Sequence, residues 1–349
     1  MALEASFIRY NLIFKQPAGT SRGVLRTKET FFLRLIEHNK IGIGECAVFR
    51  RLSYDDHPDY ENKLKWLCAH IHKDKKVLME ELKEYPSIQF GLEQALLSLK
   101  SEDGFKLFPS DFTAGKSGIK INGLIWMGEK QFMLNQIKQK LKQGFDVIKL
   151  KIGAIDFQSE LELLKFIRKD FSVEDVEIRV DANGAFHPDE ALEKLKRLSD
   201  FDLHSIEQPI KAGQPDKMAG LCEKTPLPIA LDEELIGIID NYKKGELLKQ
   251  IRPQYIILKP GLIGGFQGSN IWIDLAKEQK IGWWITSALE SNIGLNAISQ
   301  FTYILLNQMP QGLGTGSLFT NNIQAPLRVE NGRLYYDPGQ SWDLRNLKF

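Results

Sequence analysis

The feature that most constrains this chain is a regular alternation of short apolar strands and amphipathic helical patterns after about residue 115. Strands that alternate with helices predict a parallel sheet, because parallel neighbours need a long crossover connection. Closed on itself, such a sheet is a (β/α)₈ barrel, and an open doubly wound sheet is the alternative. No GxGxxG follows the first strand, which weakens a dinucleotide-binding version of the open sheet. The expected strands are IKINGLIW, DVIKLKIG, EIRVDAN, LHSIEQPI, PIALDEEL, YIILKPG, GWWITSAL and QGLGTG.

The chain before and after this alternation has a different pattern. Residues 1–115 begin with two strand patterns, ASFIRYNLIFK and ETFFLRLIEH, and then turn helical, as in YENKLKWLCAHIHKD and SIQFGLEQALLSLKS. The segment between the two strands, QPAGTSRGVLRTK, is expected to be a mobile loop. We therefore predict an α+β capping domain over 1–115, a modified TIM-like (β/α) barrel over 116–320, and a C-terminal segment, 321–349, that packs back on the capping domain. The dipeptide Asn331-Gly332 predicts a hairpin turn in that last segment.

Ionisable residues stand at the ends of five consecutive expected strands. They are Lys149 and Lys151, Asp181, Glu207, Asp232 with Glu233, and Lys259. In a barrel of this type the carboxyl ends of the strands form the face that carries the chemistry. Any one such residue is most often a solvated cap, but six in register are improbable by chance. Side-chain alternation turns Asp181, Glu207 and Asp232 toward one point, with lysines on both sides, and puts Arg179 on the same inward face.

Three converging carboxylates repel one another unless a cation lies between them. Rigid oxygen ligands suit Mg²⁺, which keeps positions open for water or substrate. We expect Mg²⁺ here, with Mn²⁺ as a substitute. The six histidines do not form a zinc-binding spacing.

The pair Lys149 and Lys151 lies two residues apart in a strand, so both side chains point to one face. Two buried ammonium groups are costly without partners, and their mutual repulsion is expected to lower one pKa. A lysine that is neutral at working pH is a general base. With a metal that binds a carboxylate, this set favours removal of the proton next to a carboxylate and stabilisation of the resulting enediolate.

The motifs KLKIG, VDANGAF, IEQPI, ALDEEL, LKPGLIGG and TSALESNIGL resemble the muconate-lactonising subgroup of the enolase superfamily. The last two, with GIGECAVFRRLSYDD near the N-terminus and GLGTG near the C-terminus, are most similar to the o-succinylbenzoate synthase family. The resemblance spans nearly the whole chain. It implies a Mg²⁺-dependent lyase that removes water from 2-succinyl-6-hydroxy-2,4-cyclohexadiene-1-carboxylate to give 2-succinylbenzoate, a step in menaquinone synthesis.

The resemblance also implies roles for individual residues. Asp181, Glu207 and Asp232 would be the metal ligands, and Asn183, Glu233 and Arg179 would orient them. Lys151 would remove the proton and return one to the departing hydroxide, Lys149 would tune it, and Lys259 would stabilise the enediolate from the opposite side. Expected substrate-binding residues, on weaker grounds, are Ser287, Gly314, Thr315, Leu52, Ser53 and Arg22. The alternative interpretation of the glycine is that it only forms a tight turn, and the alternative for Arg22 is a solvated side chain in an exposed loop.

Three other functions fit parts of the pattern. A dipeptide (Ala-Glu) epimerase shares the lysines and the metal site, but its Asp-x-Asp motif is missing from GLGTGSLF. An N-acylamino acid racemase shares both catalytic lysines, and Leu262 stands where those enzymes tend to have arginine. A catalytically inactive barrel used for binding would be expected to lack a metal-ligating acid or a basic lysine. Here the three acids and the three lysines are all present.

The remaining composition sets the context. The net charge is +1, so no basic field argues for a nucleic acid partner. The three cysteines are scattered and fit a reducing compartment. No apolar run approaches the roughly 18 residues of a membrane span, and the N-terminus lacks a signal-peptide layout. We expect a cytoplasmic protein with a small carboxylate substrate and no membrane partner.

Overall fold

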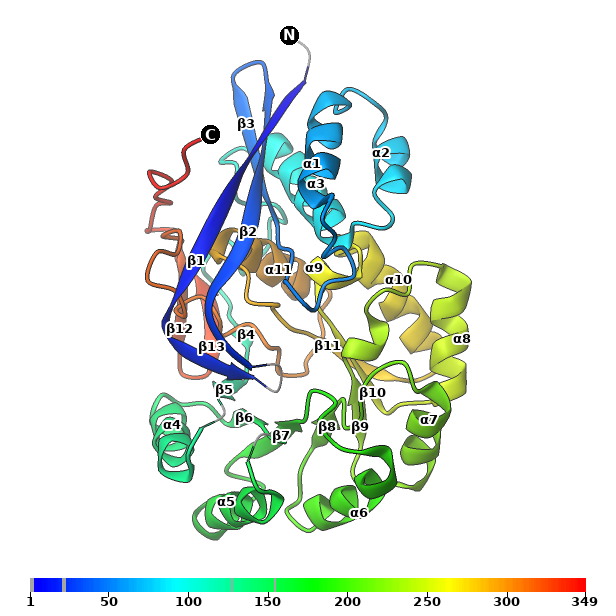
Figure 1. Cartoon of the computed structure of the whole chain (residues 1–349). Coiled ribbons are helices and arrows are strands. Elements are labelled where there is room, and N and C mark those ends of the chain that lie inside the picture. The colour runs from blue at the N-terminus through cyan, green and yellow to red at the C-terminus, as the bar shows by residue number, and fades with distance from the viewer. Residues whose placement is uncertain (1–2, 21–22, 127, 154) are drawn as a thin grey trace.

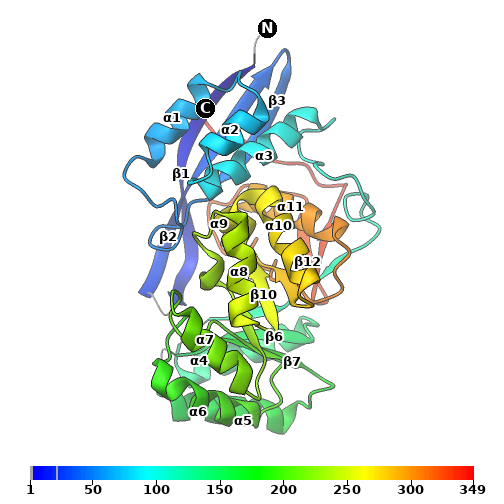
Figure 2. The same ribbon diagram turned by 90° about the vertical axis from the view of Figure 1, so that its right-hand side faces the viewer.

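The computed structural model of the chain describes residues 3–20, 23–126, 128–153 and 155–349. It shows an antiparallel sheet with three helices, stacked on a curled parallel sheet that is wrapped by further helices (Figure 1). Turning the molecule by 90° shows the helices that follow the parallel strands forming the outer layer below the first unit (Figure 2). The C-terminus lies near the antiparallel sheet (Figure 1).

The N-terminal unit, called the capping unit below, is a three-stranded sheet in the order β1-β2-β3 with helices on one face. Its elements are β1 (Glu4–Thr20), β2 (Gly23–Glu37), β3 (Lys40–Cys46), α1 (Tyr60–Ala69), α2 (Lys75–Glu81) and α3 (Pro86–Lys100). Alternate residues of β2, such as Phe31, Leu33 and Leu35, pack against the helices in an apolar cluster. The third strand was not among the predicted ones.

The loop expected over 16–28 is wrong for most of its length. Strands β1 and β2 continue through it, with Ala18 paired to Leu25 and Thr20 paired to Gly23. The register shifts between Ile13 and Ala18, which absorbs the irregular QPAG segment as a bulge. Glycine and basic residues therefore did not end the strands, because backbone pairing across a long hairpin compensates for their weak strand propensity.

The parallel sheet has seven strands in the order β11-β10-β9-β8-β7-β6-β5. Its strands are β5 (Gly123–Ile125), β6 (Val147–Lys151), β7 (Glu177–Asp181), β8 (Ser205–Glu207), β9 (Ile229–Leu231), β10 (Tyr255–Leu258) and β11 (Gly282–Ile285). The helical elements that follow them are α4 (Lys130–Lys142), α5 (Phe157–Asp170), α6 (Pro188–Ser199), α7 (Pro215–Lys224), η1 (Glu233–Leu235), α8 (Asn241–Ile251), α9 (Pro260–Ile263), α10 (Gly265–Glu278) and α11 (Asn292–Ile304). The outward residues of the strands and the apolar helix faces form one large core.

Two of the eight predicted strands differ from the prediction. The first, residues 119–126, is split into β4 (Ile119–Lys120), which pairs outside the parallel sheet, and β5, which belongs to it. The eighth, residues 311–316, is not a strand. Its residues Gln311 and Gly312 form single parallel bridges to Ile121 and Thr286, on the two sides of the gap in the sheet. A short glycine-rich segment thus occupies the eighth position and closes the barrel without a regular ladder.

The predicted C-terminal hairpin is present as β12 (Leu327–Glu330) and β13 (Arg333–Tyr336). Asn331 and Gly332 both have positive φ angles, 47° and 66°, as a tight hairpin turn requires. The hairpin pairs with β4. The tail beyond it joins an apolar cluster with Phe32 and Ile43 of the capping sheet, and Trp342 stacks on Phe105, which follows α3. The division into domains at residues 115 and 320 stays a prediction.

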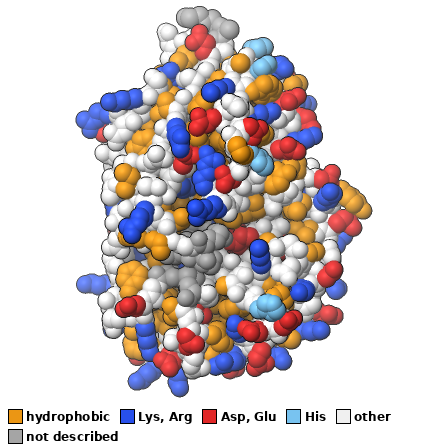
Figure 3. Space-filling model, in the orientation of Figure 1, with side chains coloured by type: hydrophobic (Ala, Val, Ile, Leu, Met, Phe, Trp, Pro, Cys, Tyr) orange, Lys and Arg blue, Asp and Glu red, His pale blue; other side chains and the backbone are white. Residues whose placement is uncertain are grey.

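The surface offers two further observations. On the face shown in Figure 3, acidic and basic side chains are interspersed, so the described atoms of that face present no extended basic field of the kind that a polyanion needs. Within the described ranges, no helix is both long and apolar enough to cross a lipid bilayer.

Candidate active site

Strand β6 turns both of its lysines into the barrel. Ile148 and Leu150 are fully buried in the outer core, so Lys149 and Lys151, on the alternate positions, face inward. The ladder from β6 to β8 places Lys151 opposite Asp181, and Asp181 opposite Glu207. Three charged residues from three neighbouring strands therefore stand in one row, at the carboxyl ends of their strands.

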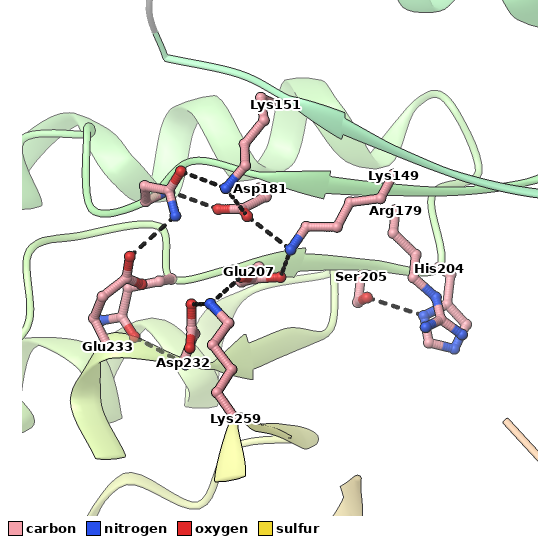
Figure 4. Close-up of polar contacts among 12 residues, drawn as sticks. Lys149, Lys151, Arg179, Asp181, His204, Ser205, Glu207, Asp232, Glu233 and Lys259 are labelled. Carbon is pink, nitrogen blue, oxygen red and sulfur yellow. Dashed lines mark hydrogen bonds and ion pairs between the residues drawn. The ribbon is translucent and has the colours of Figure 1, made fainter. Parts of the chain in front are cut away.

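The remaining members follow the next two strands. Asp232 comes directly after β9, and Lys259 directly after β10, where the chain turns into a short helix. Figure 4 shows the side chains of all six converging on one region from these strand ends. The convergence expected from the sequence is thus present for the three acids and the three lysines.

Ammonium groups lie between the carboxylates (Figure 4). Nζ of Lys149 lies 2.8 Å from Oδ2 of Asp181 and also donates a hydrogen bond to Glu207. Nζ of Lys259 donates to Asp232 and lies 3.8 Å from Oε1 of Glu207. Because these contacts are buried, each carboxylate is held by lysine rather than by water.

The buried charges shift one another's pKa values. Burial raises the pKa of Glu207 well above its ordinary value, and the neighbouring Asp181 carboxylate adds to that rise. Burial would also raise the pKa of Asp181, but Lys149 and Lys151 outweigh it and hold that pKa below its ordinary value. In the same way Lys259 outweighs burial at Asp232, whose pKa is lowered. Of the three acids, Glu207 is the one whose pKa is raised.

The fall in pKa that was expected for one lysine of the Lys149 and Lys151 pair is not found at Lys149. Burial works to lower the pKa of Lys149, but Asp181 and Glu207 overcome it, so the pKa of Lys149 is raised. For Lys259 burial is likewise overcome, chiefly by Asp232, and its pKa is raised. The carboxylates in contact with Lys149 and Lys259 thus outweigh burial at both lysines.

The donor set fits a divalent cation. The three acids supply hard oxygen ligands, and within the described residues Oε1 of Glu207 has no hydrogen-bond partner although it is buried. Among the described residues no three acids, histidines or cysteines form a preformed metal cage, since the ammonium groups occupy the space between the carboxylates. A cation would therefore replace lysine as the partner of these oxygens.

Asn183 connects the lysine of β6 to the far side of the site. Its side-chain oxygen accepts a hydrogen bond of 2.6 Å from Nζ of Lys151, which is also 2.6 Å from Asp181 Oδ2. Its side-chain nitrogen donates to Oε1 of Glu233 at 3.0 Å. Asn183 adopts a positive φ of 44°, a conformation that asparagine tolerates better than most residues. The predicted orienting residues Asn183 and Glu233 thus lie at the site.

Arg179 lies elsewhere in the barrel interior. It donates hydrogen bonds to Glu177 and to the backbone oxygen of Pro310, and its guanidinium lies 4.4 Å from the ring centre of Trp284. These partners belong to the opposite end of the sheet, so Arg179 is not brought into hydrogen-bond contact with the three acids.

A cavity of about 80 Å³ opens beside the lysines. Of the predicted residues, it is lined by Lys149, Lys151, Lys259, Asn183, Leu52, Ser287, Gly314 and Thr315. Residues that the sequence analysis missed also line it, namely Phe49, Asn122, Leu124, Trp126, Thr286, Ala288, Leu289 and Gly312. Trp126 could have been found, since it ends the first expected strand. The volume is below that of typical ligand pockets, so binding of a substrate requires the apolar lining to move.

The part of the cavity lined by Ser287, Gly314 and Thr315 offers hydrogen-bond donors. Oγ1 of Thr315 donates to Oγ of Ser287 at 2.8 Å. In the described part of the chain, the backbone N–H groups of Ala288, Gly314 and Thr315 have no partner, whereas that of Ser287 donates to Gly312. Free N–H groups beside a cavity suit an anionic group.

The other two predicted substrate residues are not seen at the cavity. Ser53 does not line it, and its hydroxyl accepts a hydrogen bond of 2.7 Å from the backbone of Phe49, which closes a turn. Arg22 lies outside the described residues. A larger cleft of about 810 Å³ between α2, α8 and α9 contains none of the predicted site residues.

Comparison with known proteins covers both units. The MenC N-terminal domain matches residues 3–99, and the enolase C-terminal domain-like family matches residues 133–345. The o-succinylbenzoate synthase of Desulfotalea psychrophila is 47% identical over 363 residues, which cover 95% of this chain and 98% of that protein. The crystal structure of MenC from the same organism superposes with a TM-score of 0.86 at 43% identity, over 96% of this chain and 100% of that one.

A more distant relative has a different activity in its name. The N-succinylamino acid racemase of Amycolatopsis sp is 26% identical over 291 residues, which cover 80% of this chain and 76% of that protein. The similarity to the synthase is therefore both higher and more complete.

Proposed function

Because the chain belongs to the o-succinylbenzoate synthase family of the enolase superfamily, we propose that it removes water from 2-succinyl-6-hydroxy-2,4-cyclohexadiene-1-carboxylate. The product is 2-succinylbenzoate, and the step belongs to menaquinone synthesis. The observation that carries this assignment is the 47% identity over nearly the full length of a synthase of that name. The cluster of three acids and three lysines beside a cavity supports it.

Members of the enolase superfamily use a divalent metal, and we assign Mg²⁺ to the carboxylates of Asp181, Glu207 and Asp232. Bound there, the metal would supply positive charge next to the carboxylate of the substrate. The metal would replace the ammonium groups of Lys149 and Lys259 as partners of these carboxylate oxygens.

Lys151 is the residue we assign as general base. Its Nζ lies at the cavity wall and is held by two oxygens, from Asp181 and Asn183, so its direction is fixed. It takes the proton from the carbon that bears the carboxylate. The ring C–O bond then breaks, the hydroxide leaves with a proton from the same ammonium, and an aromatic ring and water result.

Lys259 enters the cavity from a strand four places along the sheet from Lys151. Its ammonium would stabilise the negative charge that develops on the substrate carboxylate when the proton leaves. Lys149, buried between Asp181 and Glu207, would hold those carboxylates and Lys151 at their relative positions.

The succinyl carboxylate is assigned to the part of the cavity that Ser287, Gly314 and Thr315 line. There the unpartnered N–H groups of Gly314 and Thr315 are suitable donors to a carboxylate. Leu52 contributes apolar contact from the capping unit.

The test is turnover by the purified, Mg²⁺-loaded chain. The cyclohexadiene substrate should lose its absorbance as the aromatic product forms, and chelation of the metal should stop the change. N-succinyl amino acids and the Ala-Glu dipeptide serve as comparison substrates in D₂O. If the chain exchanges only their α-protons and leaves the cyclohexadiene intact, the synthase assignment is wrong.

A further inference from the structure

A second group of buried charges lies where the capping sheet meets the start of α11. It consists of Lys28 on β2, Glu45 on β3 and Glu290, just before the helix. Their exposed fractions are 5%, 0% and 0%, so all three have lost their contact with bulk water. Buried charges are retained at such cost only if partners satisfy them. The partners of each therefore indicate what the group does.

Strand geometry directs Lys28 toward the barrel. Lys28, Thr30 and Phe32 occupy alternate positions of β2 and share one face. On that face the hydroxyl of Thr30 donates to Oε1 of Glu45 at 2.9 Å. Phe32 packs in a cluster with Ile293 of α11. The ammonium of Lys28 thus extends from the capping unit toward the loop that precedes α11.

Glu45 has hydrogen-bond donors of its own. Besides Thr30, it accepts from the backbone N–H and the hydroxyl of Ser291, at 3.0 and 2.5 Å, and from the N–H of Gly294 at 2.9 Å. Its carboxylate therefore caps the N-terminus of α11, where the helix dipole also favours negative charge. Four donors and the dipole compensate this charge without Lys28.

Glu29, the next acid near Lys28, is paired with Arg9 and Arg50. Glu290 is different. Its Oε2 accepts one hydrogen bond, 2.6 Å from Oγ of Ser287, and in the described part of the chain its Oε1 has no hydrogen-bond partner.

Lys28 and Glu290 are left to compensate each other. Within the described residues, Nζ of Lys28 has no hydrogen-bond partner either. Burial raises the pKa of Glu290, and Lys28 is the main charge that opposes the rise. The charges that favour the ammonium of Lys28 are those of Glu45 first and Glu290 second. Glu45 already accepts four hydrogen bonds, whereas in the described part of the chain Glu290 accepts one, so the charge of Lys28 matters more to Glu290.

Glu290 is one hydroxyl away from the cavity. Ser287, which donates to Glu290, accepts in turn from Thr315, and both hydroxyl residues line the cavity. A hydrogen-bonded row thus runs from Thr315 through Ser287 to Glu290, with Lys28 beyond it. Any net negative charge at Glu290 acts on the part of the cavity that we assign to the succinyl carboxylate.

We propose that Lys28 is a positioning residue that lets this part of the cavity accept an anion. Its ammonium, delivered from the capping unit, is the counter-charge of Glu290, so that Ser287 is held in place without a net negative charge behind it. Without Lys28 the buried carboxylate would repel the carboxylate of the substrate. The proposal rests on the proposed function, since it concerns the binding of that substrate.

The experiment compares Lys28→Met, Glu290→Gln and the double variant in the full-length, Mg²⁺-loaded protein. Methionine is neutral, similar in length and suited to an apolar site. We expect Lys28→Met to raise KM by about tenfold or more and to leave kcat within about twofold, since the change acts on anion binding and not on the base. The dissociation constant of 2-succinylbenzoate, measured by calorimetry, should rise by a similar factor.

The double variant distinguishes this role from a structural one. With Glu290→Gln also present there is no charge to compensate, so KM should return to within about threefold of the Glu290→Gln value. Lys40→Met, at an exposed position of the same sheet, is the matched control and should change neither constant. Unchanged KM in Lys28→Met, or an equal loss in both Glu290 backgrounds, would overturn the proposal.

The two proposals can fail separately. A wild-type chain without turnover contradicts the synthase assignment. The role of Lys28 is then tested by comparing the dissociation constant of 2-succinylbenzoate between the wild type and Lys28→Met. A wild-type chain that turns over the cyclohexadiene, with equal product affinity in wild type and Lys28→Met, retains the synthase function and excludes the role of Lys28.

Discussion

The buried carboxylates of the parallel sheet and those of the capping unit are stabilised by different kinds of partner. In the sheet, Asp181 and Asp232 are held by lysine ammonium groups. In the capping unit, Glu45 is held by neutral donors, three of them on or next to α11. Asp55, also in the capping unit, shows a third arrangement. Within the described residues, its carboxylate accepts hydrogen bonds from the backbone N–H and the hydroxyl of one residue, Ser87.

This difference in partners separates carboxylates that can bind a ligand from carboxylates that hold the fold together. A carboxylate paired with a flexible cation can exchange that partner for a metal ion, because the lysine stem can move away. A carboxylate held by backbone N–H groups of a helix cannot release them without opening the helix. The sheet therefore keeps its charges available for a ligand, while Glu45 fixes the capping unit to the barrel. The following changes test that division.

The largest effect is expected for Lys151→Ala. Loss of the base should lower kcat by about 10³-fold or more, while folding and Mg²⁺ affinity stay near those of the wild type. Turnover of the cyclohexadiene, circular dichroism and metal titration measure the three properties. Lys130→Ala, which removes an exposed lysine paired with Glu162, is the control and should keep full activity. Substantial turnover by Lys151→Ala would remove this lysine from its assigned role.

Next in size is the effect of Glu207→Gln on the metal. Replacing one of three carboxylate ligands should weaken Mg²⁺ binding by at least about 100-fold in calorimetry. Metal affinity equal to that of the wild type would show that the three acids do not bind a common cation.

Glu45→Gln should have the opposite profile. An amide places two N–H groups where the carboxylate accepts from Ser291 and Gly294, so the free energy of unfolding should fall by about 3 kcal/mol. Chemical denaturation measures this loss, and Mg²⁺ affinity of the folded protein should be unchanged. Glu162→Gln, at an exposed ion pair, should change the free energy of unfolding by less than about 0.5 kcal/mol. Equal effects of the two substitutions would deny Glu45 its architectural role.

The six charges of the site could be predicted from the sequence because each lies in or directly after the carboxyl-terminal part of an apolar strand. Local periodicity fixes which face Lys149 and Lys151 share, and the topology of a parallel sheet brings the strand ends together. What the sequence could not show is which charges touch. The prediction paired Lys149 and Lys151 as mutually repelling groups, whereas the distances place carboxylates against Lys149.

The capping contacts were beyond prediction for a different reason. Lys28, Glu45 and Glu290 are far apart in the chain. Glu45 lies in GIGECAVFRRLSYDD and Glu290 in TSALESNIGL, but the sequence alone gave neither acid a role and did not connect either to Lys28. Only the tertiary arrangement brings them together. The sequence predicted an eighth strand that is not formed. The segment at Gln311 and Gly312 lies in the place of that strand but forms only single bridges to its neighbours.

The smallest expected effect concerns Asp55 and the pH dependence of stability. Burial raises the pKa of Asp55 to about 6, although hydrogen bonds from Ser87 oppose the rise. Between pH 4 and 6 the folded state then binds more protons at Asp55 than the unfolded state does. This group's contribution to the free energy of unfolding is therefore full below about pH 4 and is lost as the pH rises through about 6.

Asp55→Asn should remove that component. The free energy of unfolding of the wild type, relative to the variant, should fall by about 2 kcal/mol between pH 4 and pH 7, as a pKa difference of about two units requires. Urea denaturation of both proteins at several pH values measures the difference, and comparison with the variant cancels the titration of Asp181 and other acids. A difference that stays constant with pH would mean that Asp55, like Glu45, has enough donors to remain ionised. The contrast within the capping unit would then disappear, and only the contrast with the lysine-paired acids of the sheet would remain.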